Sequence, residues 1–178
     1  MWKFTCLLLV FSALLQSCAS SSGLTAAGEC DPSPLTLDLA SVAPAAGAEP
    51  VWMVDGGFGC WYDDGPVKTL WIVDRRYAGS LEVRGESVIG ESAVTFERGE
   101  AITAHLIVPN ARQTSVIPGG ASPSEHARYV FHPSYAFYPR PGCWRLTTSL
   151  GGNAVDIVVQ QVLCDASGQP EHSASGNR

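Results

Sequence analysis

Cysteines are the residues of this chain best suited to chemistry, because a thiolate can attack a substrate, bind a metal or form a disulfide. The sequence contains six of them. Cys6 and Cys18 lie in the N-terminal region, and the body of the chain holds the other four: Cys30, Cys60, Cys143 and Cys164. No Cys-x-x-Cys motif occurs, which disfavours a redox-active centre. An even number of cysteines in an exported domain is typical of structural disulfides.

Four cysteines allow three pairings. A Cys30–Cys164 bridge would tie together the two ends of the domain, and Cys60–Cys143 would then be the second bridge. We favour this nested pairing, and the other two remain open. Cys60 and Cys143 each sit in a Gly-Cys-Trp sequence. Because neighbouring strand residues face opposite sides, only one member of each Cys-Trp pair can point into a core.

Histidine, serine and acidic residues show no recognisable catalytic or metal-binding pattern. The four histidines are scattered and lack zinc-ligand spacing. No Gly-x-Ser-x-Gly turn is present to expose a serine nucleophile. Asp156 lies in an apolar run, where a charged residue is expected to face solvent. We therefore expect no metal site, no cofactor and no enzymatic activity.

Aromatic residues in expected loops are the candidate binding residues, because loop aromatics commonly anchor partners. The candidates are Trp61, Tyr62, Tyr135, Phe137 and Tyr138. The alternative is that these side chains close the open ends of the fold. A large exposed aromatic patch would favour binding.

The first 17 residues are typical of an export signal. Lys3 carries the only charge before Glu29, and the apolar stretch 4–15 is too short to span a bilayer. The stretch ends in Leu-Gln-Ser-Cys at 15–18, which resembles the bacterial lipoprotein signal pattern. In that family the cysteine is lipid-modified and becomes the first residue of the mature chain. The resemblance implies a signal peptide over 1–17 and lipidation of Cys18, whereas an ordinary signal would be cleaved near residues 19–20.

Composition divides the rest of the chain into three parts. Residues 18–28 are uncharged and almost without large apolar side chains, which predicts a flexible tether. The domain is expected over 29–166, followed by a polar, disordered tail over 167–178. The whole chain has a net charge of −6, and loss of Lys3 with the signal makes it −7. This charge gives no electrostatic reason to bind nucleic acid.

Short runs of alternating apolar and polar residues, separated by glycine- and proline-rich turns, predict an all-β domain. Strands are expected at 35–39, 51–54, 67–74, 80–86, 93–97, 101–108, 128–131, 143–148 and 155–163. Irregular structure is expected at 40–50, 110–125 and 135–142. About seven to nine short strands favour an immunoglobulin-like β-sandwich, with a jelly roll or small barrel as the alternatives.

Two segments resemble uncharacterised bacterial secreted and lipid-anchored proteins that have an immunoglobulin-like domain. One segment is Lys-Thr-Leu-Trp-Ile-Val-Asp at 68–74 with the alternating run 77–85. The other is Tyr-Pro-Arg-Pro-Gly-Cys-Trp-Arg-Leu at 138–146, with Gly151 and the apolar run to Val162. The resemblance implies the fold and supplies no catalytic residues to transfer.

These features together predict a lipid-anchored cell-envelope protein whose domain binds another molecule without catalysing a reaction. Its expected partners are a membrane, through the N-terminal lipid, and an unknown envelope protein or surface component. The expected location is exported, on the periplasmic or outer face of a bacterial membrane. The alternatives are a structural or accessory envelope protein, or a hydrolase, redox or metal-binding protein.

Intact-mass measurement of the protein taken from membranes tests the lipid and disulfide hypotheses together. We expect a mass that begins at Cys18 with added acyl chains, and four thiols that react with an alkylating agent only after reduction. A Cys18→Ala variant should lose the acyl mass. A chain that starts at residue 19 or later would contradict lipidation, and thiols that react before reduction would contradict the structural bridges.

Overall fold

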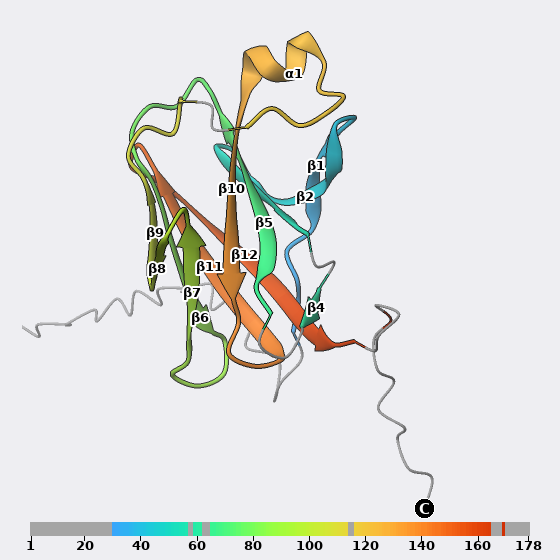
Figure 1. Cartoon of the computed structure of the whole chain (residues 1–178), viewed down its shortest axis with the longest axis vertical. Coiled ribbons are helices and arrows are strands. Elements are labelled where there is room, and N and C mark those ends of the chain that lie inside the picture. The colour runs from blue at the N-terminus through green and yellow to red at the C-terminus, as the bar shows by residue number, and fades with distance from the viewer. Residues whose placement is uncertain (1–29, 57–58, 62–64, 114–115, 165–168, 170–178) are drawn as a thin grey trace, which may run out of the picture.

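The structure is a computed structural model that describes residues 30–56, 59–61, 65–113, 116–164 and 169 (Figure 1). The predictions of a signal peptide, a lipidated Cys18 and a tether fall outside these residues. So does the predicted tail, apart from residue 169.

The described chain is almost entirely strand. Its strands are β1 (Leu35–Leu39), β2 (Val42–Ala48), β3 (Val51–Asp55), β4 (Cys60–Trp61), β5 (Val67–Asp74), β6 (Leu81–Ser87), β7 (Ala93–Arg98), β8 (Ala101–Thr103), β9 (His105–Val108), β10 (Tyr129–Phe137), β11 (Gly142–Leu150) and β12 (Asn153–Leu163). The described residues include one short helix, α1 (Pro123–Arg128). The expectation of an all-β chain is confirmed.

Two expected loops are wrong. Residues 40–50 contain strand β2, which pairs with both β1 and β3 although its sequence is rich in alanine. Strand β10 continues to Phe137 instead of ending at 131. On the edge of β10 that faces β7, Phe131 pairs with Val116, and residues 135–137 pair with β7. Pro133 lies between these pairings, in a gap of the described ladder where its missing N–H is tolerated.

The strands form one curled sheet in the order β1-β2-β3-β5-β10-β7-β6-β11-β12-β4. All pairs are antiparallel except β12 with β4. Strand β7 joins the two halves, because residues 95–97 pair with β10 and residues 93–94 pair with β6. The segment expected as one strand over 101–108 also changes partner, with β8 on β7 and β9 on β6. The sheet therefore folds back on itself, and β5 and β10 cross over β11 and β12 (Figure 1).

The main core lies inside this curl. Strand β11 contributes Trp144, Leu146 and Leu150, all fully buried, whereas Cys143 and Arg145 face outward, as the alternation predicts. Trp71 of β5 packs in the same cluster, and its Nε1 donates a hydrogen bond to Ser134 Oγ at 2.9 Å. Burial of each such side chain contributes about 1.5–3 kcal/mol.

A second apolar cluster lies on the outer face of β3, β5 and β10. Its buried members include Trp52, Ile72 and Phe131, and the β1–β2 ribbon covers them. The helix α1 fastens this ribbon, because Glu125 Oε1 accepts a hydrogen bond from the Ala40 backbone N–H at 2.9 Å. The other oxygen of Glu125 accepts from the N–H of Ser122, the N-cap of α1, and completes a capping box.

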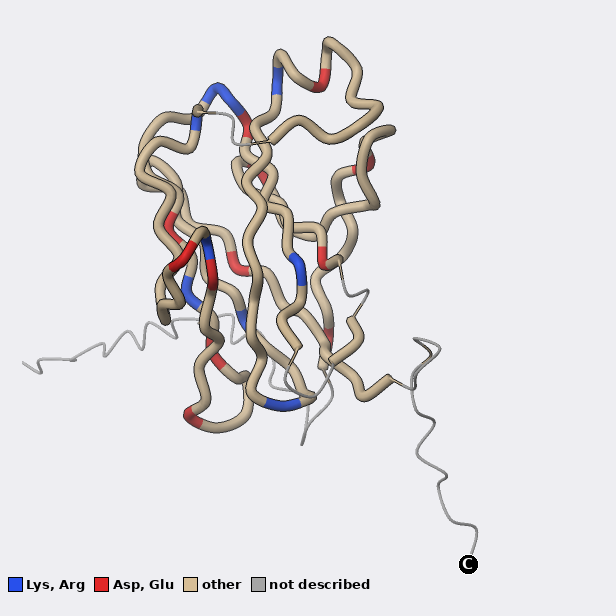
Figure 2. The backbone as a smooth tube through the Cα atoms, viewed as in Figure 1, with Lys and Arg blue, Asp and Glu red and all other residues tan. Residues whose placement is uncertain are grey.

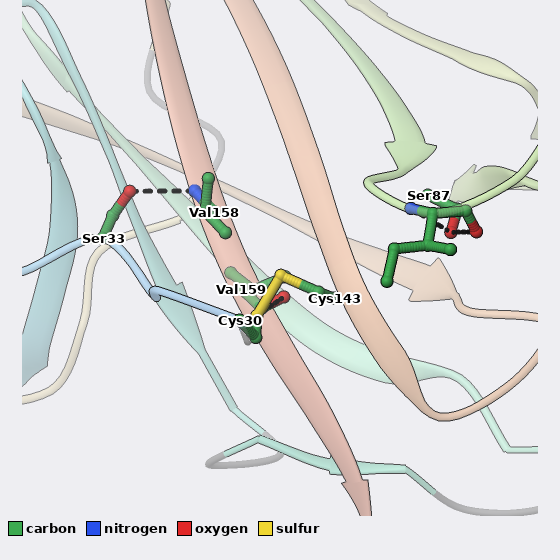
Figure 3. Close-up of a disulfide and its surroundings, with 7 residues drawn as sticks. Cys30, Ser33, Ser87, Cys143, Val158 and Val159 are labelled. Atoms are coloured by element: carbon green, nitrogen blue, oxygen red, sulfur yellow. Dashed lines mark hydrogen bonds between the residues drawn. A yellow bond between two sulfur atoms is a disulfide. The ribbon is translucent and has the colours of Figure 1, made fainter. Parts of the chain in front are cut away.

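The sheet does not close by continuous pairing between its two ends. We call the boundary between β1–β3 and β12 the seam. The segment before β1 crosses it, because Ser33 N donates to Val158 O and Ser33 Oγ accepts from Val158 N, both at 2.8 Å (Figure 3). Gly47 of β2 has a φ of +129°, and an added Cβ there would lie 2.6 Å from the backbone oxygen of Val51 in β3 and 3.2 Å from Ile157 Cδ1 in β12. Glycine therefore lets β2 adopt this φ and lie against the β3 backbone, with β12 also near.

Two disulfides bridge the strands beside the seam, but their pairing differs from the nested one we favoured. Cys30 bonds to Cys143, and Cys60 bonds to Cys164. The reason is the path of the chain. The N-terminal segment runs along β12 and places Cys30 over Cys143 of β11 (Figure 3), whereas β4 pairs parallel to the end of β12 and places Cys60 beside Cys164. Cys143 and Cys164 lie near the same end of the β11–β12 hairpin. Cys143 bonds to the segment before β1, and Cys164 bonds to β4.

A charged cluster lies at the C-terminal end of β5. The Asp74 carboxylate is fully buried and accepts hydrogen bonds from Arg76 Nη2 at 2.7 Å and from Arg128 Nε at 3.4 Å. The Arg76 guanidinium holds the pKa of Asp74 below its usual value, mainly by hydrogen bonding. Arg75 and Arg112 donate to backbone carbonyls of the same region. Basic residues gather at this end of the molecule, near α1 (Figure 2).

Disulfide mapping of the oxidised protein should recover the linked pairs 30/143 and 60/164. The bridges close loops with sequence separations of 113 and 104 residues. Loops of this length are worth about 3–5 kcal/mol each in the chain-entropy model. The double variant Cys30→Ala/Cys143→Ala should therefore lose about 3–5 kcal/mol in chemical denaturation. Recovery of the pairs 30/164 and 60/143 would show that the described arrangement is wrong.

Replacing Asp74 with asparagine should cost about 1.5–3 kcal/mol at pH 7, because Arg76 and Arg128 lose a charged acceptor. The pKa of Asp74 is lowered by folding, so its contribution is complete above the unfolded value of about 3.9 and declines as the pH falls through the folded value. Thermal unfolding of wild type and Asp74→Asn between pH 7 and pH 2 measures this difference. Asp156→Asn, which removes an exposed carboxylate, is the matched control and should change stability little. A difference that stays constant over the whole pH range would contradict the role of Asp74.

Candidate functional site

The five predicted binding aromatics do not form one exposed patch. Tyr62 lies outside the described residues. Tyr138 is 5% exposed and packs in the main core, with its ring centroid 5.7 Å from that of Trp144. Trp61 is half-buried against the same core and donates from Nε1 to Tyr138 O at 2.7 Å. The expectation that Tyr138 is an exposed loop side chain is wrong, because the chain turns this side chain inward at the end of the curl, where it fills the interior.

Tyr135 and Phe137 lie on strand β10 instead of in a loop. Both face outward, because β10 alternates and its neighbours Ser134 and Ala136 are buried. Tyr135 is 42% exposed, whereas Phe137 is half-buried. Tyr135 stands between Lys68 of β5 and Glu97 of β7 in the strand register. These two aromatics therefore belong to a sheet face.

Beside Tyr135 the outer face of the sheet is hollowed. Two adjoining hollows, of about 440 Å³ and about 310 Å³, share Lys68 and Pro133 in their linings. We call them together the outer groove. The larger hollow is lined mainly by aliphatic side chains, among them Val42, Val54, Leu70, Val116 and Ile117. The smaller hollow is lined by Glu97, Arg98, Gly99, Ser134 and Tyr135. The outer groove thus has an apolar end and a charged end.

One wall of the outer groove is a short segment that leaves its aliphatic side chains in solvent. Val116 pairs with Phe131 in an isolated bridge, and Ile117 is 64% exposed. Ile117 lines the larger hollow together with Pro118 and Pro133. An exposed aliphatic side chain beside a hollow can pack against an incoming apolar group.

Another hollow lies at the seam. We call it the seam pocket, a space of about 500 Å³ between the segment before β1, strands β2 and β3, and strand β12. Its walls are mostly apolar and include Pro32, Leu35, Ala46, Met53, Val159 and Val162. Asp55 at the end of β3 supplies a carboxylate to the lining. Concave, mainly apolar sites with a few polar groups are typical of small-molecule binding.

Buried polar groups lie near Asp55 but do not line the seam pocket. Gln161 of β12 is 1% exposed and donates from Nε2 to Asp55 Oδ2 at 2.8 Å. Among the described residues, Gln161 Oε1 and Tyr138 Oη are buried and have no hydrogen-bond partner. Burial, and after it the negative charge of Asp55, raises the pKa of Tyr138 well above its usual value. The phenol therefore stays neutral and keeps a proton to donate.

The described histidines and acidic residues do not gather into a metal-binding group. No group of three His, Cys, Asp or Glu side chains placed to hold a metal ion occurs among the described residues. His105 Nε2 lies 3.4 Å from Glu82 Oε2, and His132 is buried with Nε2 2.9 Å from Ala111 O. Burial lowers the pKa of His132, which favours the neutral ring. Asp156 is exposed, as predicted, and accepts a hydrogen bond from Thr147 Oγ1 at 2.8 Å.

The candidate binding residues named from the sequence include Tyr135, which lines the outer groove, and Phe137, which does not, but none of the described candidates lines the seam pocket. Asp55 directly follows the strand expected at 51–54, and Gln160 and Gln161 lie within the strand expected at 155–163. The available signal was Gln161, because an amide that alternates with Ile157 and Val159 must face the core and needs a polar partner there. The residues that line the pocket come from segments far apart in the sequence, which only the fold brings together.

In the described part of the chain, no helix has the length and apolar character needed to cross a bilayer. No protein-family model, curated protein or solved structure matches this sequence.

Proposed function

We propose that this protein is a lipid-anchored envelope protein whose β-domain binds an extended segment of another envelope protein in the outer groove. We propose a binding role for the domain, without catalysis. The observation that carries it is the hollowed outer face of β5 and β10, where Ile117 and Tyr135 are exposed beside about 440 Å³ and about 310 Å³ of open space.

Two features support export and anchoring. The described domain contains two disulfides, which are typical of oxidising compartments outside the cytoplasm. The Leu-Gln-Ser-Cys sequence at 15–18 resembles a lipoprotein signal. Because two or three acyl chains hold far more firmly than one, a lipidated Cys18 would keep the domain at a membrane surface.

An immunoglobulin-like β-sandwich is the proposed fold class of the domain. Its support is the antiparallel pairing on each side of the curl and the buried Trp71 and Trp144 in one core. Strand β7, which pairs with both halves, would be the strand that passes between the two sheets. In this arrangement the outer groove lies on the exposed face of one sheet.

The residues that line the outer groove indicate which side chains a partner would carry. Its apolar end, with Val42, Leu70 and Ile117, suits aliphatic side chains of an extended chain. Its other end presents Lys68 and Arg98 against a single carboxylate, Glu97, which favours an acidic residue on the partner. The structural or accessory alternative predicts that this face contacts nothing specific.

Photo-crosslinking in intact envelopes tests the binding proposal. A photoreactive amino acid replaces Ile117 or Tyr135 in the full chain, and in a matched control variant it replaces Ile107, which is 49% exposed on β9 outside the outer groove. We expect both groove positions to give an adduct of the same mass, at least fivefold more abundant than any adduct from position 107. Lys68→Glu should weaken the adduct at least fivefold, because it reverses the charge that meets the acidic partner.

Arg145→Glu is the matched charge reversal, since Arg145 is exposed on β11 and lines neither hollow. It should leave the adduct unchanged. Equal crosslinking from positions 107, 117 and 135 would contradict a specific groove, and so would equal losses from Lys68→Glu and Arg145→Glu. Absence of any adduct would favour the structural alternative.

A further inference from the structure

We infer that the seam pocket holds one acyl chain of the protein's own lipid, which is attached to Cys18 and folds back onto the domain. The inference rests on the proposed lipidation of Cys18 and adds a site for one of the chains that this lipid carries. Three features support it: the apolar walls of the pocket, the place where the N-terminal segment enters the domain, and the scarcity of other apolar groups in the two terminal segments.

The walls of the seam pocket suit an acyl chain. Its volume of about 500 Å³ lies within the usual range of small-molecule sites, about 300–1,000 Å³. The apolar lining includes Pro32, Leu35, Ala46, Met53, Val159 and Val162. Leu35 is 66% exposed, so part of this apolar surface lies in water at the mouth of the pocket. An acyl chain would cover such surface, and each methylene that it buries raises the affinity about fourfold.

The polar side chains of the lining do not call for a charged ligand. Ser33 Oγ accepts a hydrogen bond from Val158 N, and Asp55 Oδ2 accepts one from Gln161 Nε2, both at 2.8 Å. Gln160 is exposed, so water can satisfy its amide. The methylenes of an acyl chain carry no charge and no hydrogen-bonding group, so they need no polar partner inside the pocket. A neutral aliphatic chain is therefore the ligand that this lining fits.

The N-terminal segment enters the domain beside the seam pocket. Cys30 is bonded to Cys143 of β11, and its Sγ lies 3.8 Å from Val159 O of β12 (Figure 3). Two residues later the chain reaches Pro32, which lines the pocket and is followed by Ser33 in the same wall. The bridge thus fixes the start of the described chain next to the pocket.

Cys18 is close enough in the sequence for its lipid to reach this site. It precedes Cys30 by 12 residues, which span about 40 Å when fully extended. Residues 19–28 are mainly alanine, serine and glycine, and a flexible chain of this length has a root-mean-square end-to-end distance of about 17–21 Å. A short flexible tether gives an attached ligand a millimolar effective concentration. A tethered chain would therefore fill the pocket even if the free chain bound with a Kd of about 100 μM.

The two terminal segments contain little else that could fill an apolar pocket. Residues 165–178 include no aliphatic side chain larger than alanine except Pro170, and no aromatic one. Residues 18–29 include one large apolar side chain, Leu24. If Cys18 carries two or three acyl chains, one can occupy the pocket while the rest stay in the bilayer. This arrangement would hold the mouth of the pocket at the membrane surface.

Isothermal titration with 1-decanol tests the pocket and the reach of the tether without a membrane. The mature chain 18–178 carrying Cys18→Ala, exported behind a cleavable secretory signal, has no acyl group. We expect it to bind one molecule of decanol saturably, and 1-octanol about 15-fold more weakly, because two fewer methylenes are buried. The same chain with Cys18 retained and alkylated by N-decylmaleimide should bind decanol at least tenfold more weakly, since the attached chain occupies the site.

A matched pair of variants tests the walls. In the Cys18→Ala chain, Leu35→Asp should weaken decanol binding at least fivefold, whereas Ile107→Asp, the same kind of change at an exposed site on β9, should leave it unchanged. Circular dichroism confirms that each variant is folded. Decanol binding that does not saturate, equal affinities of the alkylated and unalkylated chains, or equal effects of the two substitutions would each overturn the inference.

Photo-crosslinking tests the acylated protein in intact membranes. A diazirine amino acid replaces Leu35 in the full chain, or Ile107 in the control. We expect the peptide that contains position 35 to be joined to the acylated peptide that begins at Cys18, at least fivefold more often than the peptide that contains position 107. If Cys18 is acylated but position 35 reacts only with phospholipid, or no more than position 107 does, this inference is overturned and the anchoring proposal stands. A mature chain without acyl groups would overturn both.

Discussion

The structure depends on how a curled sheet is held together at the seam, where the described strands do not form a continuous ladder. A fully closed barrel would satisfy every backbone group through a ladder. Here β12 has β11 on one side. On the other side its described partners are β4 and Gly59 at its end, and Ser33 and Cys30 near its middle. Hydrogen bonds hold this boundary at few points, so covalent bonds supply part of its stability.

The two disulfides stabilise the seam through an overlapping pairing. Each joins an upstream segment to one arm of the β11–β12 hairpin, and the two loops that they close overlap along the sequence. A nested pairing would have left the segment before β1 tied only to the end of β12. The overlapping pairing fixes both sides of the seam, so the seam pocket keeps its shape, and the β1–β2 ribbon remains positioned over the outer face where the outer groove begins.

Strands with clear period-two patterning could be predicted from the sequence almost to the residue, as β1 and β5 show. Local patterning failed where tertiary contacts decide the conformation. Strand β2 is alanine-rich and forms because β1 and β3 flank it, and β10 continues through Pro133 because the ladder has a gap there. The short helix α1 was also unexpected, although Ser122 and Glu125 provide a capping box. The pairing of the cysteines and the burial of Tyr138 depend on how distant segments meet, which no local pattern encodes.

Hydrogen–deuterium exchange on the variant Cys30→Ser/Cys143→Ser tests most directly whether the bridge holds the seam. If it does, the amides of Ser33 and Val158 should exchange faster than in the wild-type protein, while the amides of β5 and β10, deep in the sheet, should keep their protection. Unchanged exchange at the seam would contradict this account, because the hydrogen bonds alone would then suffice. Loss of protection over the whole sheet would also contradict it, since the bridge would then support the fold as a whole and not this boundary.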